Sequence, residues 1–420
     1  MESLNKYYLF LKENNINNVK ELKLYISNDV YKLKYKENKE NKENSDLILI
    51  YSNEESNNSH ELVRFFNGVI LDKNTLKIVC YTLDKCLEDD NINDILMNDV
   101  LDNRELIVQQ VFEGTLIRVF YHDDGWKICT KKMLNAYNAK WSSNKSFGEM
   151  FEEVFSNYLD YFANMNKNYC YSFLMGHNQN NIIEIENNYI IHLNTIDLLN
   201  NIVINDKIDI HEKNIKHISN YEQKINIMDK EELMNFIDQC KSNTEIYSEI
   251  GYMFLNKNRN ICQKFIKNNF KEMREIWGNT NNRLFQYLHL RKNHEKLKKY
   301  LEYFKKDKDI LLEYENYLMN IASYILNIYR NKHISKTITS VPLYIRDIIY
   351  KVHGLYKQTK NKVSFQDINI ILYDLDEKRF CSIINNIEKE RKAQIEEKAK
   401  EYETMNETIN MNESKNDMDI

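Results

Sequence analysis

The chain has 420 residues and a mass of 50.7 kDa, which is more than one ordinary hydrophobic core accommodates, so we expect two or three domains. Hydrophobic residues make up 42% and charged residues 29%, as in globular proteins. The net charge of −5 excludes a global field that attracts nucleic acid, so RNA binding would require a local basic patch.

The first 35 residues carry mixed helix and strand signals. The charged segment KENKENKENSD, residues 36–46, has no apolar residue to bury, and we expect a low-complexity loop there. Short alternating apolar runs follow, namely LILIYS, GVILD, TLKIVCYTL, GTLIRVFYH and WKICTK. Their period of two residues predicts antiparallel strands.

The segment LIRVFYHDDGWKICT predicts a β-hairpin, in which the Asp-Gly pair supplies the positive φ that a tight turn between two strands requires. Apolar residues then recur at helical spacing from Phe147 to Phe162. Ser146 precedes them as an N-cap, with Glu149 three residues later. This pattern predicts a helix that packs against the sheet.

Strand signals return in YCYSFLM, NIIEIENNYIIHLNTID and YSEIGYMFLN, and from about Ile261 onward the pattern is helical. The predicted fold class is α+β, with an antiparallel-sheet domain over residues 1–260 and an all-helical C-terminal domain over residues 261–402. Residues 403–420 are polar, and we expect a disordered tail.

The cysteines and the hydropathy of the sequence indicate the cellular compartment of the protein. The seven cysteines are scattered and form no C-x-x-C pair, which predicts a reducing environment. No run of about 18 apolar residues and no apolar signal segment occurs. We therefore expect a soluble cytoplasmic protein without membrane contact. Four histidines stand alone in the sequence, so no metal site is predicted: His122, His177, His289 and His353.

Several motifs follow one another along the predicted sheet domain: Arg64 and Gly68 in RFFNGVILD, Lys85 in TLDKCLE, Glu113-Gly114-Thr115 in VFEGT, and Thr130-Lys131 in ICTKK. KWSSNKSFGEMF comes next, with a tryptophan and a helix start. This order resembles the covalent nucleotidyltransferase superfamily of DNA ligases, RNA ligases and mRNA capping enzymes. It is most similar to bacteriophage-type RNA ligases and the RNA-ligase-like proteins of large DNA viruses, from about Arg64 to Tyr252 and more weakly through the C-terminal helices.

The resemblance implies a nucleotide pocket, with ATP and Mg²⁺ as the cofactors if any ligase activity persists. In active members a lysine amine attacks the α-phosphate and carries the nucleotide as a phosphoramide. The matching position here is Val111, and no lysine lies between Arg104 and Trp126. Because valine has no lone pair to offer, we expect no catalytic residue at this position.

Further motif positions also depart from the family pattern. The carboxylates that contact ribose and hold metal ions in ligases fall on Ser172 and Ile250, unless Glu249 compensates by a shift. The final Lys-x-Lys motif falls on FIKNNF, which keeps Lys267 but has Phe265 in the other place.

Each candidate also has a structural alternative. Glu113 and Gly114 could simply end a strand with a bulge. Four basic residues could instead line a solvated sheet face: Arg118, Lys127, Lys131 and Lys132. The block RKNHEKLKKYLEYFKKDK, residues 291–308, has the composition of an RNA-binding segment, but its helical spacing favours a packed helix with its lysines in solvent.

We predict an RNA-ligase-like protein that has lost the adenylation lysine and binds RNA or nucleotide without catalysis. The predicted binding residues are Arg64, Lys85, Glu113, Gly114, Arg118, Lys131 and Lys267. Two alternatives remain open. One is an active ATP-dependent RNA ligase or end-repair nucleotidyltransferase that uses another amine. The other is a structural scaffold that binds a protein partner.

Overall fold

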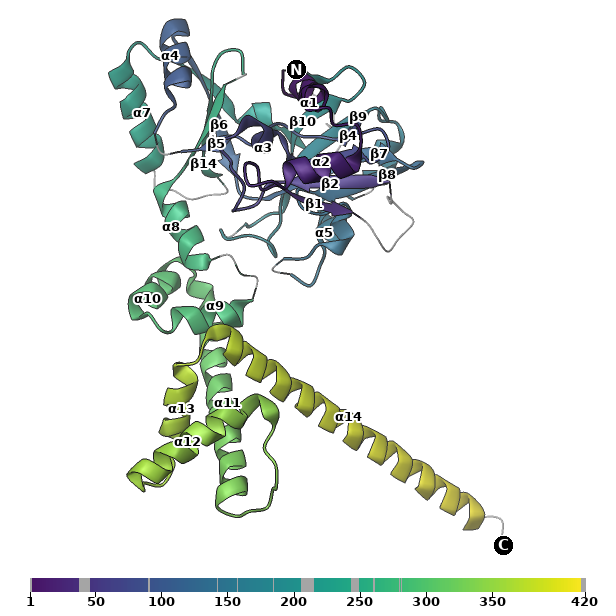
Figure 1. The fold of residues 1–420 in the computed structure, drawn as a ribbon, viewed down its shortest axis with the longest axis vertical. Coiled ribbons are helices and arrows are strands. Elements are labelled where there is room, and N and C mark those ends of the chain that lie inside the picture. Colours follow the sequence, from purple (N-terminus) through teal and green to yellow (C-terminus); the bar gives the residue numbers. More distant parts are fainter. Residues whose placement is uncertain are drawn as a thin grey trace. The chain divides into compact units, whose positions relative to one another are not determined.

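The computed structural model describes residues 2–416 except 38–45, 90, 142, 157, 184, 205–214, 243–248, 260, 279 and 281. The chain divides into two compact units, Met1–Glu275 and Ile276–Ile420 (Figure 1). Unit 1 contains three sheets and their covering helices, and the described part of unit 2 is helical. The predicted α+β class with a helical C-terminal region is confirmed.

The first sheet of unit 1 lies between the two N-terminal helices on one face and the second sheet on the other. Its elements are α1 (Glu2–Glu13), α2 (Val19–Ile26), β1 (Lys34–Glu37), β2 (Leu47–Tyr51), α3 (Glu61–Phe65), β3 (Asn67–Asp72) and β4 (Ile78–Cys80). The four strands pair antiparallel in chain order. Successive strand residues face opposite sides, so Ile48 and Ile50 pack with α1 and α2, whereas Leu47 and Leu49 pack against the second sheet.

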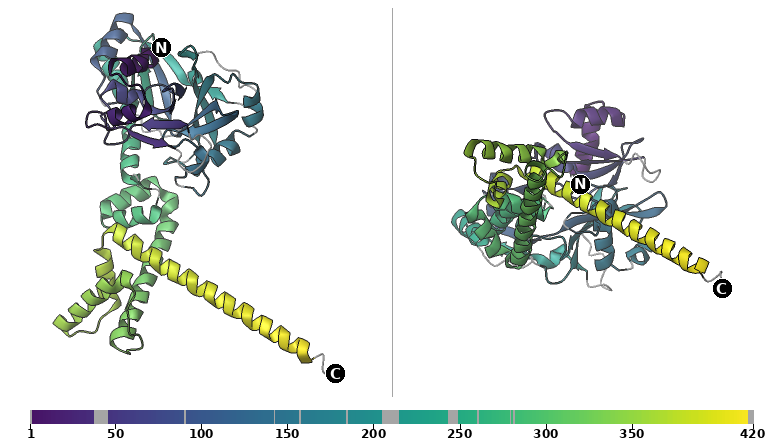
Figure 2. Two further views of the ribbon diagram at one scale, coloured as in Figure 1. Left: turned by 45° about the vertical axis from the view of Figure 1, so that its right-hand side comes forward. Right: turned by 90° about the horizontal axis from the view of Figure 1, so that it is seen from below.

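The second sheet has six strands. They are β7 (Thr115–His122), β8 (Gly125–Thr130), β9 (Tyr169–Gly176), β10 (Tyr189–Asp197), β11 (Ile202–Ile204) and β12 (Lys216–His217). The order is β11-β10-β9-β7-β8, and β12 pairs with β10. Helices α5 (Phe147–Val154) and α6 (Tyr158–Ala163) contribute Phe151 and Phe162 to the core on its other face. Figure 2 shows these layers in two further views.

The third sheet has the order β13-β6-β14-β15-β5. Its strands are β5 (Leu87–Glu88), β6 (Glu105–Phe112), β13 (Glu222–Asn226), β14 (Glu249–Leu255) and β15 (Cys262–Ile266). Helices α4 (Asp94–Asn103) and α7 (Lys230–Ser242) lie beside it in Figure 1 and share its apolar core. Two short pairings, β5 with β15 and β10 with β12, are parallel, which the predicted antiparallel sheet did not include.

The predicted hairpin is confirmed as β7 and β8, but its turn differs from the prediction. Gly125 already pairs with His122 across the ladder. The turn residues are Asp123 and Asp124, whose φ values are 47° and 55°. Aspartate enters this left-handed region more readily than most residues because its short side chain can bond locally. Of the predicted Asp-Gly pair, Asp124 supplies a positive φ, whereas Gly125 already begins β8.

The helix expected after the hairpin begins as predicted but is shorter. Ser146 and Glu149 form a reciprocal capping box at the start of α5. That helix ends at Val154, and a separate helix, α6, follows. The predicted loop over residues 36–46 lies mostly outside the described residues, since 38–45 are not described and Lys36 belongs to β1.

Unit 2 contains α9 (Arg283–Leu290), α10 (His294–Tyr303), α11 (Lys308–His333), α12 (Arg346–Thr359), α13 (Phe365–Tyr373) and α14 (Glu377–Asn416), and α8 (Asn268–Trp277) ends at its start. Single 3₁₀ turns are η1 (Ala136–Asn138), η3 (Ile218–Tyr221), η4 (Lys305–Asp307) and η5 (Leu343–Ile345). In α10 the lysines are exposed while Tyr300 is buried, which confirms the packed-helix interpretation of the basic block.

Two predicted boundaries differ from the structure. The helical pattern was expected from about Ile261, but β15 extends the third sheet to Ile266, and unit 1 continues to Glu275. A five-residue strand is too short for its period to stand out against the helical pattern that follows it. The tail expected to be disordered from residue 403 lies within α14 as far as Asn416. None of the described helices is long and apolar enough to cross a membrane.

Candidate functional site

Val111 lies near the end of β6, where it pairs with Gly251 of β14. One residue further along the pairing is irregular, because Phe112 pairs with Glu249 and Ile250 is passed over. This β-bulge adds one residue to β14 and changes the direction in which the side chain of Glu249 points. The bulge therefore gives Glu249 the pairing position that a regular strand would give to Ile250.

Glu249 serves as the counter-charge of a buried lysine. Lys267 is fully buried, and its Nζ lies 3.1 Å from Glu249 Oε1. Its backbone N–H donates to the carbonyl of Ile250 at 3.0 Å, and its ammonium lies 5.7 Å from the ring centre of Tyr252. A buried ammonium requires a compensating charge or hydrogen bonds. Lys267 is thus held beside the same strand that pairs with Val111.

Glu113 and Gly114 form the two-residue link from β6 in the third sheet to β7 in the second. The Glu113 carboxylate accepts hydrogen bonds from the backbone N–H groups of Ile182, at 2.5 Å, and Ile183, at 2.8 Å. Burial raises the pKa of Glu113 to about 7, although both hydrogen bonds oppose this shift. A Cβ on Gly114 would lie 2.7 Å from the carbonyl oxygen of Met175. Both residues therefore fix the crossing between sheets.

Arg118 is fully buried, so the alternative of a solvated sheet face is wrong for this residue. Its guanidinium donates to the carbonyl oxygen of Gly68 and, at 2.7 Å, to that of Thr130. Gly68 has a φ of 90°, and a Cβ there would lie 2.7 Å from the carbonyl oxygen of Lys131. Arg118 thereby joins β3 to the end of β8 and brings two of the sequence motifs into contact.

Four lysines from three segments form a lysine cluster: Lys85, Lys131, Lys132 and Lys264. Burial, the largest cause, and the charges of Lys85, Lys132 and Arg118 together lower the pKa of Lys131 to about 8. The pKa of Lys85 is lowered by burial and by Lys132, and that of Lys264 mainly by burial. Glu88 is the acidic residue that partly opposes the shifts of Lys85 and Lys264.

The ammonium of Lys131 has no ion pair with any residue that the structure describes. A group of like charges in a partly buried place raises the electrostatic energy of the folded protein. An anion bound among these ammonium groups would remove that cost. The cluster therefore has the electrostatics of a phosphate site.

Arg64 and Lys85, which belong to two different sequence motifs, lie next to each other in unit 1. The backbone N–H of Lys85 donates to the carbonyl of Arg64 at 2.9 Å. The ammonium of Lys85 donates to Asn58 Oδ1 at 2.9 Å, and the guanidinium of Arg64 donates to the carbonyl of Ser59 at 2.6 Å. Lys132 and Lys264 were not among the predicted binding residues, because neither matches a family motif and their proximity depends on tertiary structure.

The positions expected to lack carboxylates are buried. Ser172 is fully buried on β9, pairs with Arg118 across the sheet, and donates from its Oγ to Thr82 Oγ1 at 3.2 Å. Ile250 is 7% exposed. Neither position offers a ligand for Mg²⁺, whose preferred ligands are carboxylate and water oxygens.

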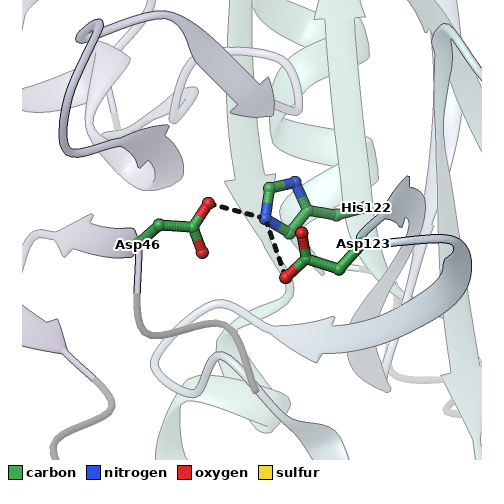
Figure 3. Close-up of side chains that lie close together, drawn as sticks. All are labelled: Asp46, His122 and Asp123. Atoms are coloured by element: carbon green, nitrogen blue, oxygen red, sulfur yellow. Dashed lines mark hydrogen bonds and ion pairs between the residues drawn. The ribbon is translucent and has the colours of Figure 1, made fainter. Parts of the chain in front are cut away.

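The expectation that His122 is isolated is wrong. At the turn of the β7–β8 hairpin its Nε2 lies 3.0 Å from Asp46 Oδ2 and 3.5 Å from Asp123 Oδ2 (Figure 3). One nitrogen and two oxygens in this arrangement are possible ligands of a divalent cation. Asp123 is exposed, however, and exposed acidic groups beside a histidine are common without a metal.

The other three histidines also have neighbours. His177 Nε2 lies 3.6 Å from Glu153 Oε2, and His289 Nδ1 lies 3.6 Å from Glu377 Oε1. The ring of His353 stacks on that of His333 with centroids 4.0 Å apart. The only group of three or more possible metal ligands among the described residues is the one around His122.

No known protein-family model matches the chain. The chain is 22% identical over 257 residues to an Immediate-early protein ICP-46 homolog of Invertebrate iridescent virus 6, covering 56% of this chain and 55% of that protein. An Immediate-early protein ICP-46 homolog of Invertebrate iridescent virus 3 is 47% identical over 57 residues, which are 14% of this chain and 12% of that protein. The chain spans at most about half the length of these curated relatives.

Among solved structures, Naegleria gruberi RNA ligase with PPi is 12% identical, with a TM-score of 0.33 over 45% of this chain and 58% of the ligase. A mutant of that ligase with ATP and Mn has the same identity, TM-score and coverage. Likeness at this TM-score does not define a shared fold or activity. The resemblance to RNA ligases therefore depends on the order of motifs in the sequence.

Proposed function

We propose that this chain is an RNA-ligase-like protein that binds phosphate groups of RNA or of a nucleotide without forming a covalent adduct. The observation that carries this proposal is the lysine cluster, in which Lys131 has a pKa lowered to about 8 and no acidic partner among the described residues. Lysine ammonium groups are the usual point-charge ligands of phosphate. The motif residues Arg64 and Lys85 lie at the same place.

The absence of covalent chemistry is proposed from three positions. Val111 offers no nucleophile, and buried Ser172 and Ile250 offer no carboxylate to hold a metal ion over a leaving pyrophosphate. The bulge brings Glu249 into pairing position, but its carboxylate is engaged by Lys267. Losing the nucleophile at this position alone removes the covalent route that active members of the family use.

A second candidate function is favoured by one observation. A lysine nucleophile needs a lowered pKa so that its neutral amine is populated, and Lys131 has one. Lys131 could then carry the nucleotide in place of the missing lysine. This alternative predicts a phosphoramide on Lys131 that disappears in Lys131→Arg, since arginine keeps the charge but is not deprotonated at working pH.

Two measurements on the purified full chain decide between these functions. Incubation with α-³²P-labelled ATP or GTP and a divalent metal, followed by denaturing electrophoresis, should show no acid-labile adduct under the first proposal. An adduct that is lost in Lys131→Arg would establish the second function and overturn the first.

Filter retention of labelled single-stranded RNA tests the binding itself. We expect an affinity that falls steeply as salt rises, because each neutralised phosphate of a single strand contributes about 0.7 to the slope of log K against log salt. Lys131→Ala combined with Lys132→Ala should lower this slope by about 1.4, that is, by two contacts. Lys127→Ala, on the same strand before the cluster, is the matched control. A double variant with an unchanged slope would place the binding elsewhere.

A further inference from the structure

Two cysteines face each other where β5 and β15 run side by side. The parallel register pairs Leu87 with Gln263 and Glu88 with Lys264, so one step earlier it sets Cys86 beside Cys262. Neighbouring strands lie about 4.8 Å apart, which is within the range of Cα separations that a disulfide spans. The two thiols are hydrogen-bonded to each other. Both are free and only partly buried.

The charges around this pair favour a thiolate on one of its members. The hydrogen bond from Cys86 lowers the pKa of Cys262, and the charge of Arg64 acts in the same direction, against burial and Asp84. The shared hydrogen bond and burial raise the pKa of Cys86, and Lys264 and Arg64 oppose this. Cys262 is therefore the member that loses its proton first, and a thiolate is the form that reacts with oxidants.

A second group of close thiols provides a contrast within the same unit. Cys80 Sγ lies 3.2 Å from that of Cys170 and 3.9 Å from that of Cys129. All three are fully buried, and burial raises the pKa of Cys80 and Cys129 well above the usual range. An oxidant in solution therefore has no open path to these three sulfur atoms, and it would find no thiolate there. Proximity of two thiols is therefore not enough to make them reactive. Solvent access and the lowered pKa of Cys262 distinguish Cys86 and Cys262 from the buried group.

We propose that Cys86 and Cys262 are a redox modification site that closes to a disulfide when the protein meets a hydroperoxide. The Cys262 thiolate attacks one peroxide oxygen, so an S–O bond forms, the O–O bond breaks, and hydroxide or alkoxide leaves with the electron pair. The Cys86 sulfur then attacks the sulfenic sulfur, so the S–S bond forms and the S–O bond breaks. The departing hydroxide takes the Cys86 proton as water. The two thiols lose two electrons, which reduce the hydroperoxide.

The bond would join two segments of the lysine cluster. Cys86 follows Lys85 directly, and Cys262 begins the strand that carries Lys264. The modification depends only on the thiols and their surroundings, so it stands independently of phosphate binding.

Peptide mapping of the full chain tests the site. The reduced, folded protein is treated with hydrogen peroxide, its remaining thiols are alkylated in denaturant, and it is digested with trypsin without reduction. Trypsin separates all the relevant cysteines, because Cys86 falls in the peptide of residues 86–104 and Cys262 in that of residues 260–264. We expect these two peptides to be disulfide-linked and the number of free thiols to fall from seven to five. A reductant should restore the original number.

Three conservative variants sharpen the test. Cys262→Ser should abolish the link, and Cys86→Ser should leave a sulfenic acid on Cys262 that a dimedone reagent traps. Cys381→Ser in α14 is the matched control, and the link should still form. The proposal is overturned if both peptides are recovered unlinked after a treatment that oxidises Cys381, or if the link that forms joins Cys80 to Cys170.

Discussion

At the scale of single residues, the positive charge of Lys131 favours the binding of phosphate but destabilises the folded protein. Its pKa in the folded protein, about 8, lies below the ordinary lysine value of 10.5. Its charge is therefore a cost to the folded state at every pH below about 8, and this cost is relieved as the pH rises from there towards 10.5. A residue retained at such a cost is typical of a binding site, where a ligand supplies the missing counter-charge.

The pH dependence of RNA binding follows from the same pKa. Between pH 7 and pH 9 the protonated fraction of Lys131 falls about tenfold, so RNA affinity should fall through this residue alone by a factor of at most about ten. Lys85 and Lys264, whose pKa values are also lowered, add to the fall. Binding titrations at fixed ionic strength and several pH values measure it.

Lys131→Arg is the control for this pH dependence, because a guanidinium keeps its charge throughout the range. The fall in affinity should become shallower in this variant while binding at pH 7 is kept. An equally steep fall in Lys131→Arg would assign the pH dependence to other groups. Lys131→Met should bind RNA more weakly at pH 7 without unfolding more readily, since it removes a charge that burdens the folded state.

At the scale of elements, the bulge in β14 determines whether Glu249 or Ile250 occupies the carboxylate position of the motif, which the sequence left open. Motif spacing assigned one carboxylate position to Ile250 and left Glu249 as a shifted alternative. The extra residue in the strand places Glu249 opposite Phe112, next to the residue that pairs with Val111. A bulge leaves no mark in the hydrophobic period of so short a strand, and a slip of one residue reverses the faces.

The pair of Glu249 and Lys267 gives a stability prediction. Glu249→Gln removes the carboxylate that lies 3.1 Å from the buried ammonium of Lys267, and we expect the free energy of unfolding to fall by about 3 kcal/mol, the low end for a broken buried pair because Glu249 is partly exposed. Lys267→Met added to Glu249→Gln should recover much of the loss, because the buried charge is then removed together with its carboxylate. Chemical denaturation of the two variants and the parent measures both effects. A double variant no more stable than Glu249→Gln would contradict this account.

Local features with a period or a cap were predictable from the sequence, and features made by distant contacts were not. The hairpin from Thr115 to Thr130 and the capping box at Ser146 follow from alternation and from short-range hydrogen bonds. The lysine cluster and the burial of Arg118 arise from segments more than 40 residues apart, which no periodicity connects. Sequence motifs found Lys131 and Lys85 individually, but their mutual effect on pKa required the fold.

At the scale of the whole molecule, the two units have separate roles in the proposed function. All residues of the lysine cluster belong to unit 1, and the basic block of residues 291–308 belongs to unit 2. That block contains three aromatic residues, of which Tyr300 is buried and Tyr303 and Phe304 are half-buried, so none of them is fully exposed to stack on a base. The electrostatic case for phosphate binding therefore favours unit 1.

A truncation after Trp277, at the end of α8, separates these possibilities. The fragment keeps all three sheets and their cores, so we expect it to fold, with a cooperative unfolding transition by circular dichroism. Its affinity for single-stranded RNA at a fixed salt concentration should stay within about threefold of that of the full chain, because the phosphate contacts are retained. The same fragment carrying Lys131→Ala and Lys132→Ala should bind more weakly by the same factor as the full-length double variant. A folded fragment that no longer binds, while the full chain does, would move the RNA site to the helical unit and leave the lysine cluster with a nucleotide or another small anion as its ligand.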